Sequence, residues 1–241
     1  MRASTVSRYS PHGEGLEEVN ALDIATTVKF GYGNSVPYLT AQNASFQSVL
    51  FDAFEKGTGI PESGVLLETG VYRDDEFSHS GTWSLSMANG ATITLPNMSM
   101  TNEVNQLRLY AWVKGTGTID INGTNVVPVS QPLGLQQSDW TLLVTLVEVT
   151  NKADFEININ YTNSLGQSLY LDDLRVQPLD SEMTCYVYDR NTLRLLTILD
   201  DRHYGLYYQY NEEGKLTRKQ IETERGVKTI QETFYNGYQN D

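Results

Sequence analysis

Apolar and polar residues alternate in short runs through the middle of this sequence, between residues 46 and 178. The clearest run is 107–114, where every second residue is aliphatic. Similar runs occupy residues 83–87, 118–121, 155–161 and 168–176, and an apolar run spans 140–149. Alternation places successive side chains on opposite faces of an extended strand. Many such strands without a convincing helix predict an all-β fold, a jelly-roll β-sandwich of two facing sheets.

The last of these runs predicts the closing strand of the sandwich. Tyr170, Asp172, Leu174 and Val176 share one of its faces at period two. A buried carboxylate without a partner is unfavourable. Either that face stops being core at Asp172, or a cation or hydrogen-bond donors meet the carboxylate.

The residue pattern of the sequence changes on both sides of the predicted sandwich. This change predicts three parts: 1–45, 46–178 and 179–241. The first part is polar and turn-rich, and the segment from Leu16 to Phe30 is compatible with two short strands or one poor helix, of which we favour the strands. In the third part the motif Tyr186-Val-Tyr188 recurs as Tyr208-Gln-Tyr210, which indicates an internal repeat with a period of about 22 residues. Each copy predicts a strand, a polar turn and a returning strand, and such units need neighbours to stack on.

Charge and composition exclude several partners. A net charge of −13 argues against nucleic acid, since phosphate binding needs a basic surface. No apolar run is long enough to predict a membrane span. Cys185 is the only cysteine, so we expect a buried, inert thiol. The first residues lack the apolar core of a secretory signal, so the chain is either cytoplasmic or a segment of a longer protein, and we favour the second interpretation.

The C-terminal repeat resembles the tyrosine-aspartate (YD) repeats of Rhs-type proteins. Their pattern, Tyr-x-Tyr-Asp-x-x-Gly-Arg-Leu, is similar to Tyr208-Gln-Tyr-Asn-Glu-Glu-Gly-Lys-Leu216. The copy beginning at Tyr186 lacks the glycine, and Ser7-Arg-Tyr-Ser-Pro-His-Gly13 resembles a further degenerate unit. The resemblance implies flanking β-hairpins of the kind that build large secreted or surface shells.

The middle part resembles the jelly-roll carbohydrate-binding modules that are appended to xylanases and laminarinases. The matching stretches are Phe51-Asp-Ala-Phe-Glu55, His79-Ser-Gly-Thr-Trp-Ser-Leu85, Leu109-Tyr-Ala-Trp-Val-Lys114, the strand from Trp140, and Tyr170-Leu-Asp-Asp-Leu174. A sandwich of this kind with Rhs-like flanks is similar to pieces of large surface proteins of Bacteroidetes-type bacteria. The resemblance implies an extracellular or cell-surface location within a larger exported protein.

The same resemblance implies a structural calcium ion. Its ligands would be Glu55 and Asp172, with Asp173 as a substitute and backbone carbonyls of residues 79–81 completing the site. Calcium accepts six to eight oxygen ligands in irregular geometry. The alternative is that Asp172 and Asp173 are hydrogen-bonded to backbone or paired with Arg175.

A second candidate site is a sugar-binding surface on strand 107–114. Arg108, Tyr110 and Trp112 share the face opposite its aliphatic face, and exposed aromatic rings can stack on a pyranose. The alternative is that Tyr110 and Trp112 lie under a loop or against the Rhs-like part. We expect Trp83 and Trp140 in the core, because each has aliphatic partners at period two.

Nothing in the sequence predicts catalysis. A glycosidase needs two carboxylates across a cleft, and the run Asp74-Asp-Glu76 is explained by a solvated loop. His12, His79 and His203 lack the spacing of metal ligands. We therefore expect a non-catalytic extracellular module that binds polysaccharide, or else a structural module that contacts other parts of a larger surface protein and has no sugar ligand.

Overall fold

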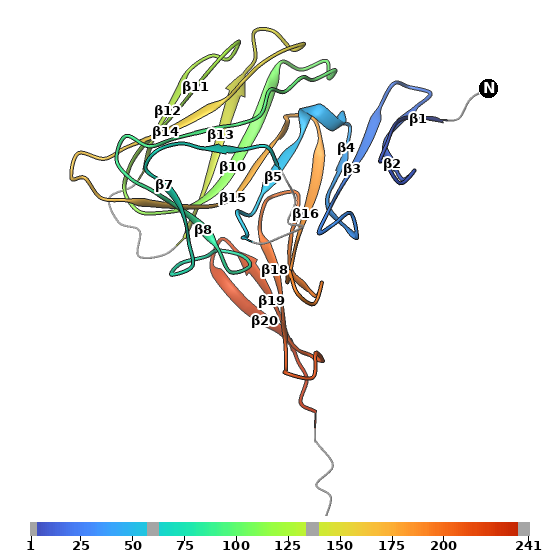
Figure 1. The fold of residues 1–241 in the computed structure, drawn as a ribbon, viewed down its shortest axis with the longest axis vertical. Helices are drawn as coiled ribbons and strands as arrows, with labels where there is room; N and C mark the ends of the chain where they lie inside the picture. The colour runs from blue at the N-terminus through green and yellow to red at the C-terminus, as the bar shows by residue number, and fades with distance from the viewer. Residues whose placement is uncertain (1–3, 57–62, 134–139, 236–241) are drawn as a thin grey trace, which may run out of the picture.

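The computed structural model describes residues 4–56, 63–133 and 140–235. Within these ranges the chain is all-β apart from one short 3-10 turn, η1 (Phe46–Ser48), which confirms the predicted fold class. The strands form three antiparallel sheets (Figure 1). Two of them make a sandwich, and the third is a long meander beside it.

The meander contains nine of the described strands, in the order β1-β2-β3-β4-β16-β17-β18-β19-β20. Their bounds are β1 Ser4–Tyr9, β2 Gly15–Asn20, β3 Ala25–Gly31, β4 Val36–Gln42, β16 Glu182–Tyr188, β17 Leu195–Leu199, β18 Gly205–Tyr210, β19 Leu216–Thr223 and β20 Gly226–Glu232. Strand β4 pairs directly with β16, Leu39 opposite Cys185 and Gln42 opposite Glu182. The two flanking segments of the sequence therefore form one sheet, and the sandwich is inserted between two of its neighbouring strands.

The sandwich consists of two sheets. One has the order β13-β10-β15-β8-β7, with β5 also paired to β15, and the other has the order β12-β11-β14-β9-β6. The bounds are β5 Leu50–Asp52, β6 Leu66–Leu67, β7 Val71–Asp74, β8 Ser84–Met87, β9 Thr92–Thr94, β10 Gln106–Lys114, β11 Gly117–Asn122, β12 Val129–Leu133, β13 Thr141–Glu148, β14 Asn158–Thr162 and β15 Leu169–Pro178.

The closing strand of the sandwich returns beside the first strand, as the sequence predicts. In the β5–β15 pair Leu174 lies opposite Asp52 and Val176 opposite Leu50. The aliphatic residues of β10 and β15 point between the two sheets and form one core with β11 and β14. The shared face predicted for Tyr170, Asp172, Leu174 and Val176 is wrong, because β15 carries an extra residue at Asp173, where φ is +50°, and the alternation reverses there. In the second sheet β11 pairs with β12, Ile121 opposite Val129 and Gly117 opposite Leu133.

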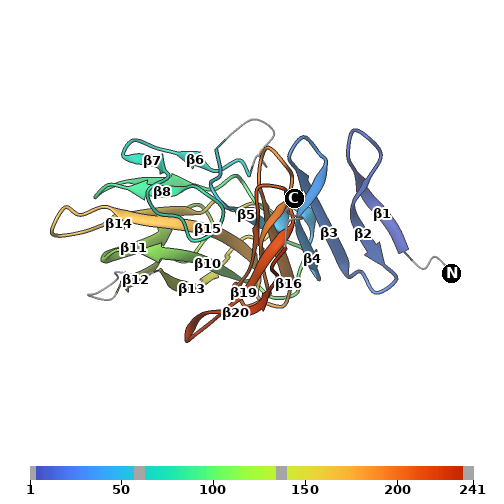
Figure 2. The ribbon, with the colours of Figure 1, turned by 90° about the horizontal axis from the view of Figure 1, so that it is seen from below.

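A second, smaller core joins the meander to the sandwich. It contains Leu39 of β4, Cys185 of β16 and Phe51 of β5. Cys185 is fully buried, and burial raises the pKa of its thiol to about 12, so it is the inert thiol expected from the sequence. Figures 1 and 2 show β1 and β2 farthest from the sandwich, with β16–β20 beside it.

Candidate functional site

A cleft of about 590 Å³ lies where the sandwich meets strands β17–β20 of the meander. The sandwich contributes the loop before β8 and the residue that precedes β13. The meander contributes side chains from its inward face. Among the residues that line this sheet–sandwich cleft are His79, Trp140, Thr197, Tyr207, Gln209, Gln220 and Glu222.

On the meander side, the residues that line the cleft include Tyr207 and several polar side chains next to it. Tyr207 lies opposite Gln220 in the β18–β19 pair and opposite Thr197 in the β17–β18 pair, so the three share one face of the sheet. Gln209 extends this polar row, because its Nε2 donates to Gln220 Oε1 at 3.1 Å. The row offers amide donors and acceptors beside an aromatic ring.

His79 connects the two sides of the cleft. Its Nδ1 lies 2.7 Å from Asp173 Oδ2 in the sandwich, and its Nε2 lies 3.1 Å from Glu222 Oε1 and 3.0 Å from the Tyr207 hydroxyl in the meander. Burial by itself would lower the pKa of His79, but the hydrogen bonds and charges of Asp173 and Glu222 outweigh it, and the net shift is upward. The Asp173 and Glu222 carboxylates on either side of the imidazole favour its protonated form, and His79 links the sandwich to the meander through them.

Trp140 supplies the aromatic surface on the sandwich side. Its ring is half-buried and meets His79 edge to face, with centroids 6.0 Å apart. Trp140 and Trp83 were both expected in the core, and the structure corrects this, since Trp83 is also half-buried, with Lys56 Nζ 4.9 Å from its ring centroid. Both residues lie just before a strand, where the alternating pattern no longer decides which way a ring points.

The aromatic pair on β10 does not form an open surface. Tyr110 and Trp112 are each only 5% exposed. His203, in the turn between β17 and β18, stacks on Tyr110 with centroids 5.2 Å apart, and Trp112 Nε1 donates to the His203 carbonyl at 3.0 Å. Of the two stated possibilities the second is present, because Tyr110 and Trp112 lie against the C-terminal segment, which removes their apolar area from water and leaves no open sugar-binding face here.

Arg108 belongs to the same covered face. Its Nη1 donates to the Tyr110 hydroxyl at 3.1 Å, and its Nη2 donates to the Leu179 carbonyl at 3.3 Å. The three residues expected to bind sugar thus make contacts within the chain itself.

Glu55 folds back onto the loop of residues 79–83. Its Oε1 accepts hydrogen bonds from the amides of Thr82 at 2.6 Å and Trp83 at 3.0 Å. Gly81 has φ +60°, and a Cβ at this position would collide with the Glu55 carboxylate, so the close approach requires glycine. Burial raises the pKa of Glu55, and the two amide hydrogen bonds offset part of that shift.

Asp172 and Asp173 reach the same loop from β15. Asp172 Oδ2 accepts from the amides of His79 at 2.7 Å and Ser80 at 3.2 Å, and Asp173 Oδ1 accepts from the Ser80 hydroxyl at 2.6 Å. Both acids are fully buried. Burial, and then the charge of Asp173, raise the pKa of Asp172 well above its usual range.

The three acids named as calcium ligands all contact the loop of residues 79–83. As placed, their oxygens accept hydrogen bonds from amides, a hydroxyl and an imidazole. The described ranges hold no group of three or more His, Cys, Asp or Glu side chains arranged to bind a metal. Hydrogen bonding to backbone, one of the stated alternatives, is present for Asp172, and calcium itself stays a prediction.

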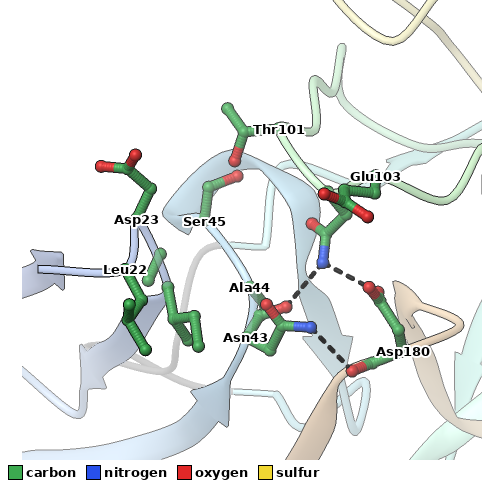
Figure 3. A pocket seen from close by; sticks show the side chains of 11 residues that line it. Leu22, Asp23, Asn43, Ala44, Ser45, Thr101, Glu103 and Asp180 are labelled. Atoms are coloured by element: carbon green, nitrogen blue, oxygen red, sulfur yellow. Dashed lines mark hydrogen bonds between the residues drawn. The ribbon is translucent and has the colours of Figure 1, made fainter. Parts of the chain in front are cut away.

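Another cavity, of about 410 Å³, opens between the β2–β3 turn, the chain after β4 and residues 101–103 (Figure 3). Asn43 and Asn102 line it and both bind Asp180: Asn43 Nδ2 donates to its carbonyl at 2.9 Å, and Asn102 Nδ2 to its Oδ1 at 2.8 Å. Asp23 and Glu103 add further carboxylates, and none of the described residues that line the space is aromatic. This cavity lacks the surface on which a sugar ring stacks, so the sheet–sandwich cleft is the better candidate site.

Sequence reasoning missed the meander half of the cleft. The alternation in β18 and β19 shows that Tyr207, Gln209, Gln220 and Glu222 belong to one face of a hairpin. That Gln and Glu side chains share this face with a tyrosine is a usable signal. The signal does not show that Trp140, more than 60 residues earlier in the chain, lies across from them.

No protein-family model and no curated protein matches the chain. Solved structures similar to it include the CBM22-1 xylan-binding domain of Xyn10C from Paenibacillus barcinonensis, with 18% identity and a TM-score of 0.36 over 53% of this chain and 92% of that domain. TmCBM61, solved in complex with β-1,4-galactotriose, has 11% identity and a TM-score of 0.35 over 46% and 85% of the two chains. A family 16 carbohydrate-binding module has 21% identity and a TM-score of 0.33 over 50% and 92%. In the part of the chain that the structure describes, no helix is long and apolar enough to cross a membrane.

Proposed function

We propose that this chain is a non-catalytic module that binds carbohydrate in the sheet–sandwich cleft. The observation that carries the proposal is the pairing of Trp140 and Tyr207 with the amide row of Gln209 and Gln220 in a cleft of about 590 Å³. Aromatic rings bind the apolar face of a sugar, and amides bind its hydroxyls. The volume falls within the range of small-ligand pockets.

The charge around the cleft favours a neutral glycan. Glu222 lines the cleft, and the whole chain carries a net charge of −13. Sulfated or uronate-rich polymers would be repelled by this field. Neutral polysaccharides are therefore the class of ligand that best matches the charge around the cleft.

The cleft does not favour hydrolysis. Glu222 is the only carboxylate among its described lining residues, whereas most glycosidases need two facing carboxylates. Glu222 is also engaged, with Oε2 accepting from the Gly205 amide at 2.9 Å. Binding without bond cleavage is the simpler use of this geometry.

The setting that we propose is a larger exported surface protein. The strand-turn-strand form of β16–β17 and β18–β19 is the form that a YD-type repeat implies, and the terminal segments join in one sheet. In that setting the sandwich would be a domain inserted into an Rhs-like sheet of an extracellular protein, with the rest of that protein as its neighbour.

A structural role without a sugar ligand is the second candidate. It is favoured by the buried contact between sandwich and meander, where Arg175 and His203 are both fully buried. Such a contact makes the two parts one rigid unit, which suits a link in a longer protein.

A glycan array separates the two functions. The intact chain should bind one class of neutral plant, algal or host glycan, and Trp140→Ala and Gln220→Ala should each lose that binding. Trp83→Ala is the matched control, because Trp83 is also half-buried but does not line the cleft. Silence across the array, or equal loss in all three variants, would reject the cleft as a sugar site.

A further inference from the structure

A separate cavity of about 310 Å³ lies between strands β2–β4 of the meander and the start of the sandwich. Phe30 and Tyr38 line it from the meander, and Phe46 and Phe51 line it from the segment that leads into the sandwich. Lys29 also lines it. The described lining of this N-terminal cavity thus includes four aromatic side chains and one cationic side chain, and it shares no residue with the lining of the sheet–sandwich cleft.

The ammonium of Lys29 has few partners. Its Nζ donates to the Val49 carbonyl at 2.7 Å and lies 4.5 Å from the centroid of the Phe46 ring. An ammonium carries three donors. The carbonyl uses one of them, which leaves capacity for a ligand.

A second cation lies nearby. The Arg8 guanidinium is 4.6 Å from the centroid of the same Phe46 ring. Burial, and then the charge of Arg8, lower the pKa of Lys29 to about 8. Two cations therefore gather at one ring in a chain that is strongly acidic overall.

The two cations differ in their surroundings, because Arg8 is exposed to solvent whereas Lys29 is partly buried. Neither Lys29 nor Arg8 forms an ion pair within the described ranges. Glu17 lies opposite Arg8 in the β1–β2 pair, and its carboxylate accepts hydrogen bonds from the Phe46 amide and the Ser7 hydroxyl, both at 2.6 Å. A cation withdrawn from water without a counter-charge is unfavourable, and a bound anion would remove that penalty.

We propose that the N-terminal cavity binds a small organic monocarboxylate, whose carboxylate pairs with Lys29 and whose apolar part lies among the aromatic side chains. Lys29 is the only cationic side chain among the described residues that line the cavity, and its single ammonium matches a single negative charge. The aromatic lining disfavours strongly hydrated dianions such as sulfate, and the volume, at the low end for ligand pockets, restricts the ligand to a small molecule. An ion pair with a partly buried ammonium supplies a charge-assisted hydrogen bond.

The test uses phenylacetate as the probe and isothermal titration calorimetry on the intact chain. Phenylacetate should bind saturably in the millimolar range or tighter and should raise the melting temperature. Phenylacetamide, which is neutral and similar in shape, should bind about tenfold more weakly or not at all, since each tenfold step is about 1.4 kcal/mol. Lys29→Met should lose the preference for the carboxylate, and Lys219→Met, outside the cavity, should retain it.

Several results would overturn the proposal. These are equal binding of phenylacetate and phenylacetamide, retention of the preference in Lys29→Met, or no saturable heat for phenylacetate with the intact chain. The comparison of the two probes needs no variant, so the test holds even where Lys29→Met folds poorly. A negative result in this test would not bear on the proposed glycan binding, because the N-terminal cavity and the sheet–sandwich cleft are separate.

Discussion

The indole of Trp112 lies face to face with the imidazole of His79, with ring centroids 4.0 Å apart and planes inclined by 12°. The same indole donates through Nε1 to the His203 carbonyl. Trp112 of the sandwich therefore lies between two histidines, one from the loop before β8 and one from the meander. The face of β10 that carries Trp112, which the sequence offered as a sugar-binding surface, is therefore the contact surface between the sandwich and the meander.

Replacing Trp112 by alanine should destabilise the whole chain. Truncating a buried tryptophan costs about 3–5 kcal/mol, because packing area is lost and a cavity remains. Urea denaturation of the two proteins measures the difference. Trp140→Ala, at a half-buried position, is the control and should lose much less. Similar losses in both variants would show that the Trp112 contact is not a principal joint.

Arg175 should be a second joint, since its fully buried guanidinium connects β15 to the β17–β18 turn. Its Nη1 donates to the Asp200 carbonyl at 2.7 Å, and its Nη2 lies 3.2 Å from both the carbonyl and a carboxylate oxygen of Asp201. Arg175→Met should cost about 3 kcal/mol in the free energy of unfolding, because buried acceptors lose their donor. Asp201→Asn should cost less than about 1 kcal/mol, since the Asp201 side chain is 46% exposed and screened by solvent. The opposite order of losses would contradict this assignment.

His79 and His203 should respond to pH in opposite directions. The folded-state pKa of His79 is raised, so its contribution to stability is complete below its unfolded pKa and is lost as pH rises through the folded pKa. The pKa of His203 is lowered, first by burial and then by the charge of Arg175, so its contribution is present above the unfolded pKa and is lost as pH falls. Its Nε2 lies 2.6 Å from the Asp173 carbonyl, a hydrogen bond that the neutral ring can donate.

The measurement is the free energy of unfolding of the intact chain, His79→Gln and His203→Gln at mildly acidic and mildly alkaline pH. The difference between the intact chain and His79→Gln should be larger on the acidic side. For His203→Gln it should be larger on the alkaline side. Parallel pH profiles for all three proteins would refute the assigned protonation states.

Calcium should raise the melting temperature by a few degrees, if the ion predicted from the sequence binds near Asp172. The physical reason is that a divalent cation would relieve the burial and mutual repulsion that raise the pKa of Asp172, and binding to the folded state alone stabilises it. Thermal melts with calcium and with a chelator should differ for the intact chain and coincide for Asp172→Asn. Asp75→Asn, in an exposed loop, should behave like the intact chain. Identical melts with calcium and chelator would mean that amide and hydroxyl donors alone compensate the buried acids.

The sequence by itself determined that the middle of the chain forms strands and that the last sandwich strand returns beside the first. It also showed that a carboxylate at Asp172 needs donors or a cation, and the amides of His79 and Ser80 are there. These inferences hold because alternation is a local property: it depends on neighbouring residues and on the pleat of the strand.

Only the tertiary structure decided what lies against each face. The pairing of β4 with β16 joins residues about 140 positions apart, and it brings the β17–β18 turn over Tyr110 and Trp112. The same docking places Trp140 across from Tyr207 and so creates the cleft. Period-two alternation identifies which side chains share a face, but it contains no information about which distant segment covers that face, because that choice depends on the packing of the whole chain.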